Sequence, residues 1–240
     1  ATTEIYTLSL HDALPILTYA RRALDLLQEG DYYERGTTAA LLGLAYWTSG
    51  NLEAAHRSFA DGLANLQMGG GILKIAIGGA VILAHIRIAQ GRLHEAVRTY
   101  EQSLQLATEQ GELVLQGTAE LYLGLSELHR ERGDLEAARE HLLKGEALGE
   151  QASLPGHEFL WCLAWARIKK AQGDLDGALT SYRACLEIAE RLVAQDPDKT
   201  LWLGDLSASY ERIGDVRHDQ GDLDGAREQI GRALSIFEGD

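Results

Sequence analysis

The stretch GDLEAA at residues 133–138 is one copy of a pattern, Gly-x-Leu-x-x-Ala, that decides the fold of this chain. The pattern occurs five times, at residues 50–55, 91–96, 133–138, 173–178 and 221–226. Successive glycines are 41, 42, 40 and 48 residues apart. A period of this length is typical of solenoids of stacked helix pairs, because one pair cannot bury its apolar face alone. The sequence therefore predicts an all-α solenoid with an extended surface suited to recognition rather than catalysis.

Each copy of the pattern is expected to lie where the first helix of a pair ends and the second begins. Its glycine can adopt the left-handed conformation that closes a helix. An Asn or Asp follows in four of the five copies and can cap the next helix. The alanine is expected to be small because the two helices cross closely there.

Reading outward from these turns predicts a repeat domain over residues 17–238. It consists of half a repeat at 17–30 and full repeats at about 37–66, 72–110, 113–151, 156–194 and 199–238. The expected helix pairs are 37–49 with 52–66, 72–89 with 93–110, 113–132 with 135–151, 156–172 with 175–194, and 199–220 with 223–238.

The first sixteen residues, ATTEIYTLSLHDALPI, are interpreted differently. They lack the basic start and the small-residue cleavage site of a signal peptide. They resemble the conceptual translation of a sequencing-library adapter, so no function is expected for residues 1–16. Residues 17–27 look like the second helix of a repeat, and we therefore expect the chain to start in mid-repeat as part of a longer protein.

Composition excludes several classes of protein. The net charge is −14, from 22 basic and 36 acidic residues, which argues against nucleic-acid binding by this segment. Two cysteines in 240 residues do not make a disulfide framework, so a reducing cytoplasm is expected. No apolar run is long enough to predict a membrane-spanning helix.

The sequence contains no complete motif for catalysis, metal binding or cofactor binding, so the chain is not expected to be an enzyme. The glycines at 69–71 lead to Ile-Leu-Lys rather than to the Lys and Ser or Thr of a P-loop. His94-Glu95 and His157-Glu158 begin a zinc-protease motif but lack its second histidine. The eight histidines are expected to be surface or core residues.

The two cysteines, Cys162 and Cys185, lie equally far from the turn at 173–174, so a helix hairpin places them at the same level. Facing helix axes are typically about 8–10 Å apart. On that spacing a strain-free disulfide is not expected, and the pair is interpreted as packed free thiols.

The repeats resemble tetratricopeptide repeats, which implies a right-handed superhelical solenoid of helix hairpins. The first full unit matches the small and aromatic positions of that motif with Gly43, Tyr46, Ala55, Phe59 and Gly62. Later units depart from it at the tyrosine position, which is occupied by Arg87, His129, Lys169 and Arg217.

The phrases LLGLAYWTSGNLEAA, IAQGRLHEAVRTYEQSL and LYLGLSELHRERGDLEAAREHL resemble the repeat region of large bacterial LuxR-family regulators related to the maltose regulator. In that family a P-loop ATPase module precedes the repeats and a helix-turn-helix domain follows them. Residues 189–237 depart from this pattern and look more like the repeats of long bacterial tetratricopeptide arrays.

The tetratricopeptide resemblance also implies a binding site, because the first helix of each pair lines the concave groove. When the repeats are aligned on their turn glycines, the family's groove positions fall on an apolar patch and on a cationic patch. The candidate ligand- or partner-binding residues are Trp47, His85, Ile88, Glu127, Arg130, Arg167 and Lys170. Such a groove could take a peptide's side chains together with its carboxylate, whereas a sugar would stack on the indole.

Two functions follow from the resemblance. The first is the sensing region of a LuxR-family transcriptional regulator, which binds a protein, a peptide or a small-molecule effector in its groove. The alternative is a protein–protein interaction scaffold in a bacterial tetratricopeptide array, without a small-molecule effector. Neither requires a membrane or a cofactor.

Overall fold

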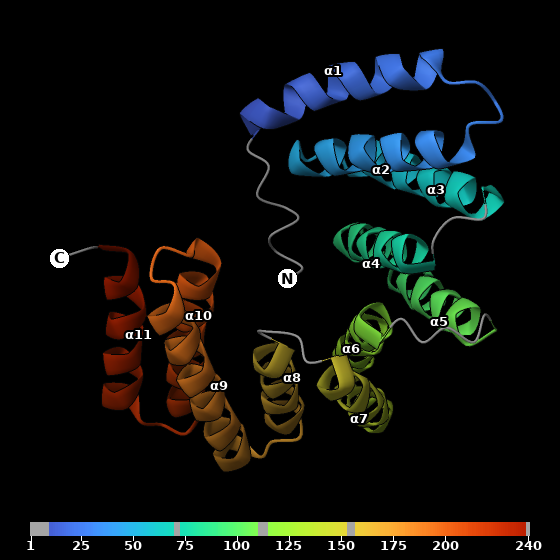
Figure 1. Cartoon of the computed structure of the whole chain (residues 1–240). Helices are drawn as coiled ribbons and strands as arrows, with labels where there is room; N and C mark the ends of the chain where they lie inside the picture. Colours follow the sequence, from blue (N-terminus) through green and yellow to red (C-terminus); the bar gives the residue numbers. More distant parts are fainter. Residues whose placement is uncertain (1–9, 70–72, 110–114, 153–156, 239–240) are drawn as a thin grey trace. The chain divides into compact units, whose positions relative to one another are not determined.

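The computed structural model describes residues 10–69, 73–109, 115–152 and 157–238, and every regular element in these ranges is a helix (Figure 1). The chain divides into two compact units, one up to Leu125 and one from Ser126 onward, and each unit is described by itself. The helices are α1 (Leu10–Leu26), α2 (Tyr32–Thr48), α3 (Leu52–Met68), α4 (Leu73–Ala89), α5 (Leu93–Glu109), α6 (Leu115–Glu131), α7 (Leu135–Ala152), α8 (His157–Ala171), α9 (Leu175–Gln195), α10 (Thr200–Asp219) and α11 (Leu223–Glu238).

Within the first unit α1 packs on α2, and the hairpins α2–α3 and α4–α5 follow. Within the second unit the hairpins α8–α9 and α10–α11 follow α7, and α9 packs against α10. Two helices start earlier than the sequence indicates: α1 begins at Leu10 rather than at residue 17, and α2 begins at Tyr32 rather than at residue 37. The sequence also predicts short linkers at residues 69–71, 110–111 and 154–156, of which all but Gly69 lie outside the described residues.

The five turns have one geometry. The glycines of the pattern have φ between 74° and 84°, the left-handed region in which a side chain is strained. In the turn after α6, the Gly133 N–H donates to the Arg130 carbonyl at 3.0 Å and the Asp134 N–H donates to the His129 carbonyl at 2.9 Å. The same two bonds recur at the other four turns and close each first helix.

The predicted caps and close crossings are also present. The side chains of Asn51, Asp134, Asp174 and Asp222 each accept a hydrogen bond from the backbone N–H three residues ahead, at 2.9–3.2 Å. The alanine of the pattern is at most 4% exposed in every copy. The first helix also carries a small residue seven residues before each glycine: Gly43, Ala84, Ser126, Ala166 and Gly214, all buried. Small side chains at both positions let the two helices of a hairpin pack closely.

Three of the four polar residues at the tyrosine position of the repeat contact the second helix of their own hairpin. Lys169 donates to the Ser181 hydroxyl at 3.0 Å, and the imidazole rings of His129 and His141 stack with centroids 5.1 Å apart. Arg87 donates to the Thr99 hydroxyl. In each case the partner lies twelve residues further on. Three of the departures from the tetratricopeptide motif thus form side-chain contacts between α4 and α5, α6 and α7, and α8 and α9, whereas Arg217 bonds to Asp222 in the turn before α11.

Among the described residues no helix is both long enough and apolar enough to cross a membrane.

Candidate functional site

In the first unit, the candidate residues lie on the first helices α2 and α4. Trp47 and His85 meet edge to face, with ring centroids 6.4 Å apart. Trp47 packs against the buried cluster of Ala55, Phe59, Leu83 and Ile86, and burial lowers the pKa of His85. Ile88 lies one turn after His85 and is half-buried. This surface is therefore apolar and aromatic, with an imidazole that is neutral at pH 7.

In the second unit, the candidate residues form a chain of ion pairs across successive first helices. Glu127 on α6 accepts from Arg130 on the same helix at 2.9 Å and from Arg167 on α8 at 3.2 Å. All three side chains are 19–31% exposed. One carboxylate thus holds two guanidinium groups together at the surface between α6 and α8.

The ion pairs continue from α8 to α10. The Lys170 ammonium group lies 2.9 Å from the Asp219 carboxylate. The hydrogen bond from Lys170, and then its positive charge, lower the pKa of Asp219. Arg130 also contacts Glu131 at 2.5 Å. Burial lowers the pKa of Arg130, but its bonds with Glu127 and Glu131 outweigh burial and raise it. We name the set Glu127, Arg130, Arg167, Lys170 and Asp219 the charged ladder.

The two arginines of the charged ladder have more N–H donors than Glu127 accepts from. Each guanidinium group has five N–H bonds that can donate. Glu127 accepts two hydrogen bonds from Arg130 and one from Arg167. A carboxylate of a ligand can therefore share the two arginines with Glu127. Arginine binds such groups in a planar, two-pronged geometry. The sequence placed these cations on successive first helices, but it did not show that Asp219 pairs with Lys170.

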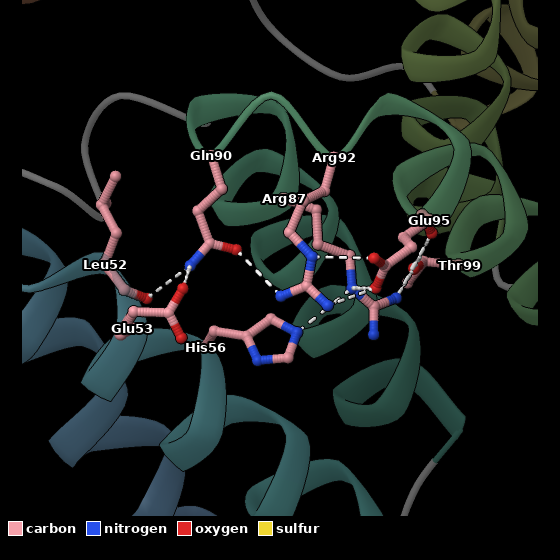
Figure 2. Close-up of polar contacts among 8 residues, drawn as sticks. All are labelled: Leu52, Glu53, His56, Arg87, Gln90, Arg92, Glu95 and Thr99. Atoms are coloured by element: carbon pink, nitrogen blue, oxygen red, sulfur yellow. Dashed lines mark hydrogen bonds and ion pairs between the residues drawn. The ribbon is translucent and has the colours of Figure 1, made fainter.

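Sequence reasoning missed a second polar cluster, at the joint between α3 and the α4–α5 hairpin (Figure 2). Arg87 donates to His56 Nε2 at 3.4 Å and to the Glu95 carbonyl at 3.3 Å, and Gln90 donates to the Leu52 carbonyl at 3.2 Å. Burial, followed by the charges of Arg92 and Arg87, lowers the pKa of His56. The sequence contains one indication of this cluster, the arginine at the tyrosine position, Arg87. Its partners could not be predicted because they lie up to 31 residues away in the chain.

A groove of about 340 Å³ lies beside this cluster, between the second helices α3 and α5 with α4 beneath. Arg87 and Thr99 line it together with three glutamine side chains, Gln67, Gln102 and Gln105. A smaller groove of about 240 Å³ lies at the equivalent place between α1 and α3. Neither groove was predicted, because each needs the side chains of three helices.

The structure confirms the interpretation of the two cysteines as packed free thiols. Both are free thiols, as expected, but their sulfur atoms are only 2.8 Å apart. The sequence placed the two cysteines at the same level of the hairpin, but it did not predict so close a contact between the sulfur atoms.

The described helices and their turns define a tetratricopeptide-type helical repeat protein. The chain belongs to the family described as the MalT-like TPR region, whose model matches residues 2–208. The match ends within α10, and it includes most of the stretch that the sequence attributes to an adapter. No curated protein matches the chain.

Solved structures share the fold at low sequence identity. BtubC (BKLC) from P. vanneervenii is 19% identical with a TM-score of 0.74, over 95% of this chain and 89% of that chain. The apo form of RapI is 14% identical with a TM-score of 0.68, over 95% and 91%. The APC/C hetero-tetramer Cut9–Hcn1 is 16% identical with a TM-score of 0.66, over 95% of this chain and 38% of that chain. These similarities support the fold alone.

Proposed function

We propose that this chain is the sensing repeat region of a large, cytoplasmic bacterial transcriptional regulator of the LuxR family. It binds a protein or peptide partner, or a small-molecule effector, through the first helices of its repeats. The observation that carries this proposal is the match to the MalT-like TPR region over residues 2–208.

The charged ladder supports an acidic group as the part of the ligand that is recognised. Arg130 and Arg167 are held by Glu127 in an otherwise acidic chain. Their side chains are pre-organised by these ion pairs, so binding orders few further rotamers. A protein partner is favoured because the same fold occurs in the hetero-tetramer of Cut9 and Hcn1.

Binding at the charged ladder gives a route to regulation. Glu127 and Arg167 join α6 to α8, and Lys170 and Asp219 join α8 to α10. A ligand carboxylate that draws the arginines away from Glu127 changes how successive hairpins are held. A ligand that favours one such arrangement shifts the population toward it.

The alternative is an interaction scaffold in a bacterial tetratricopeptide array. It is favoured by residues 189–237, which resemble array repeats, and by the end of the family match at residue 208.

Sequencing the source DNA on both sides of this reading frame distinguishes the two functions. A P-loop upstream and a helix-turn-helix downstream, in one continuous frame, would support the regulator. Further repeats alone, or a break near 189–198, would support the scaffold or a chimera. The same sequence shows whether residues 1–16 belong to the gene, and hence whether the repeat domain starts at residue 17.

Binding can be tested with a displayed library of random peptides that end in a free carboxylate. We expect the wild-type chain to select peptides, and Arg130→Ala/Arg167→Ala to weaken their binding at least tenfold, because a charged hydrogen bond contributes about 1.5–3 kcal/mol. The control is Arg139→Ala/Arg183→Ala, which removes two exposed arginines from the second helices α7 and α9. Equal affinity of the ladder variant and the wild type would remove both arginines from the site.

A further inference from the structure

The two cysteines lie in contact within one hairpin. Cys162 on α8 and Cys185 on α9 are 23 residues apart, and the Cys185 thiol donates a hydrogen bond to the Cys162 sulfur at 2.8 Å. A disulfide bond is about 2.05 Å long, so the sulfurs need to approach by roughly 0.8 Å to become bonded.

The repeat explains this close approach. Cys185 lies twelve residues after its turn glycine, where the other copies have Gly62, Ser103, Gly145 and Ala233. In the first copy a Cβ built on Gly62 would lie 3.2 Å from the Ala40 nitrogen on the facing helix. The second helix therefore carries a small residue at this level in every copy, and in one copy this residue and its contact on the first helix are both cysteine.

The surroundings give the two thiols different roles. Cys162 is half-buried, its S–H donates to the Ser181 carbonyl at 3.1 Å, and Lys169 bonds to the Ser181 hydroxyl nearby. The hydrogen bond from Cys185, and secondarily the charge of Lys169, lower the pKa of Cys162. Cys185 is fully buried, and the bond that it donates and its burial raise its pKa. Cys162 is thus the more accessible and more nucleophilic thiol.

We propose that Cys162 and Cys185 form a redox-modification site at which a hydroperoxide produces an intrachain disulfide between α8 and α9. The Cys162 thiolate attacks the outer peroxide oxygen, the O–O bond breaks, and the leaving alkoxide or hydroxide takes up a proton. Cys162 becomes a sulfenic acid. The Cys185 sulfur then attacks the Cys162 sulfur, the S–O bond breaks, and water leaves with the Cys185 proton. Two thiols are oxidised and one peroxide is reduced.

The test is to treat the reduced full chain with hydrogen peroxide and measure its intact mass and free thiols. We expect a loss of about 2 Da, from two hydrogens, and of both free thiols in the monomer. Trypsin should then release a cross-linked pair of peptides, because Arg167, Lys169, Lys170 and Arg183 separate the cysteines. The disulfide should raise the Tm by roughly 5–10 °C, since it closes a loop within one hairpin, and a reductant should reverse the rise.

Three variants sharpen the test, each checked for helicity by circular dichroism. Cys185→Ala should stop at a sulfenic acid on Cys162 that a dimedone probe labels, and Cys162→Ala should leave Cys185 largely unreacted. Lys169→Gln should slow disulfide formation by about threefold, through a smaller thiolate fraction. Lys144→Gln, an exposed lysine on α7, is its matched control. Peroxide that leaves both thiols reduced, or that produces only intermolecular disulfides or sulfinic acid, would overturn the proposal.

Discussion

At the scale of single residues, the backbone conformation of a glycine decides whether a larger residue can replace it without strain. Gly133 in the turn after α6 has φ of 77°, whereas Gly231 lies inside the exposed face of α11. A Cβ at either position would meet no atom within 4 Å. The two positions therefore differ in backbone conformation and not in space.

This difference predicts opposite effects of the same substitution. Gly133→Ala should lower the free energy of unfolding by about 1–2 kcal/mol, because an L side chain is strained at this φ. Gly231→Ala should raise it by about 0.5–1 kcal/mol, because alanine loses less backbone entropy in a helix. Urea unfolding followed by circular dichroism measures both. The same sign for both variants would contradict the argument.

At the scale of helices, three hairpins contain side-chain pairs twelve residues apart that the tetratricopeptide motif does not predict. His129 on α6 and His141 on α7 form such a pair, with their rings stacked. Burial, followed by the charges of His129 and Lys144, lowers the pKa of His141, while Glu140 and Asp134 oppose this. His141 therefore binds a proton less readily in the folded hairpin than in the unfolded chain, where a histidine titrates near pH 6.5.

This pair predicts a loss of stability in mild acid. As pH falls below 6.5 the unfolded state binds more protons at His141 than the folded state does, so the free energy of unfolding decreases. Urea unfolding at pH 7.5 and pH 5.5 should show this decrease, and His141→Gln should reduce it. His94→Gln, which removes an exposed histidine of α5, serves as control and should reduce it less. An unchanged pH dependence in His141→Gln would refute the role of the pair.

At the scale of the whole molecule, stability should be local to each unit. The core of the first unit includes Phe59, which is 2% exposed and packs with Ala55, Leu83 and Ile86. The core of the second unit includes Tyr182, also 2% exposed, which packs with Ile213 and Val216. Helix-hairpin repeats contact only their neighbours, so their stability is a sum of local terms.

Hydrogen exchange measured by mass spectrometry tests this locality. Phe59→Ala should cost about 3–5 kcal/mol in its own unit and lower protection in α2–α5. Protection in α8–α11 should change much less. Tyr182→Ala should give the converse pattern. An equal loss of protection in both units for either variant would show that the chain unfolds as one cooperative body.

The sequence by itself determined the repeat, its turns and its helices. Glycine at 173 requires a left-handed turn, aspartate at 174 caps the next helix, and alanine at 178 allows a close crossing. These features depend on residues that are neighbours in the chain, so they can be predicted from spacing and local backbone preference. The start of α1 was not predicted, because residues 10–16 were excluded from the fold.

Only the tertiary structure decided which side chains meet between helices. Glu127 pairs with Arg167 across 40 residues, Arg87 reaches His56 across 31, and the sulfurs of Cys162 and Cys185 come within 2.8 Å. Each of these contacts depends on how far a helix is rotated about its axis and how closely its neighbour approaches. Both are determined by packing small residues such as Gly62 against a facing backbone, which the repeat pattern alone does not specify.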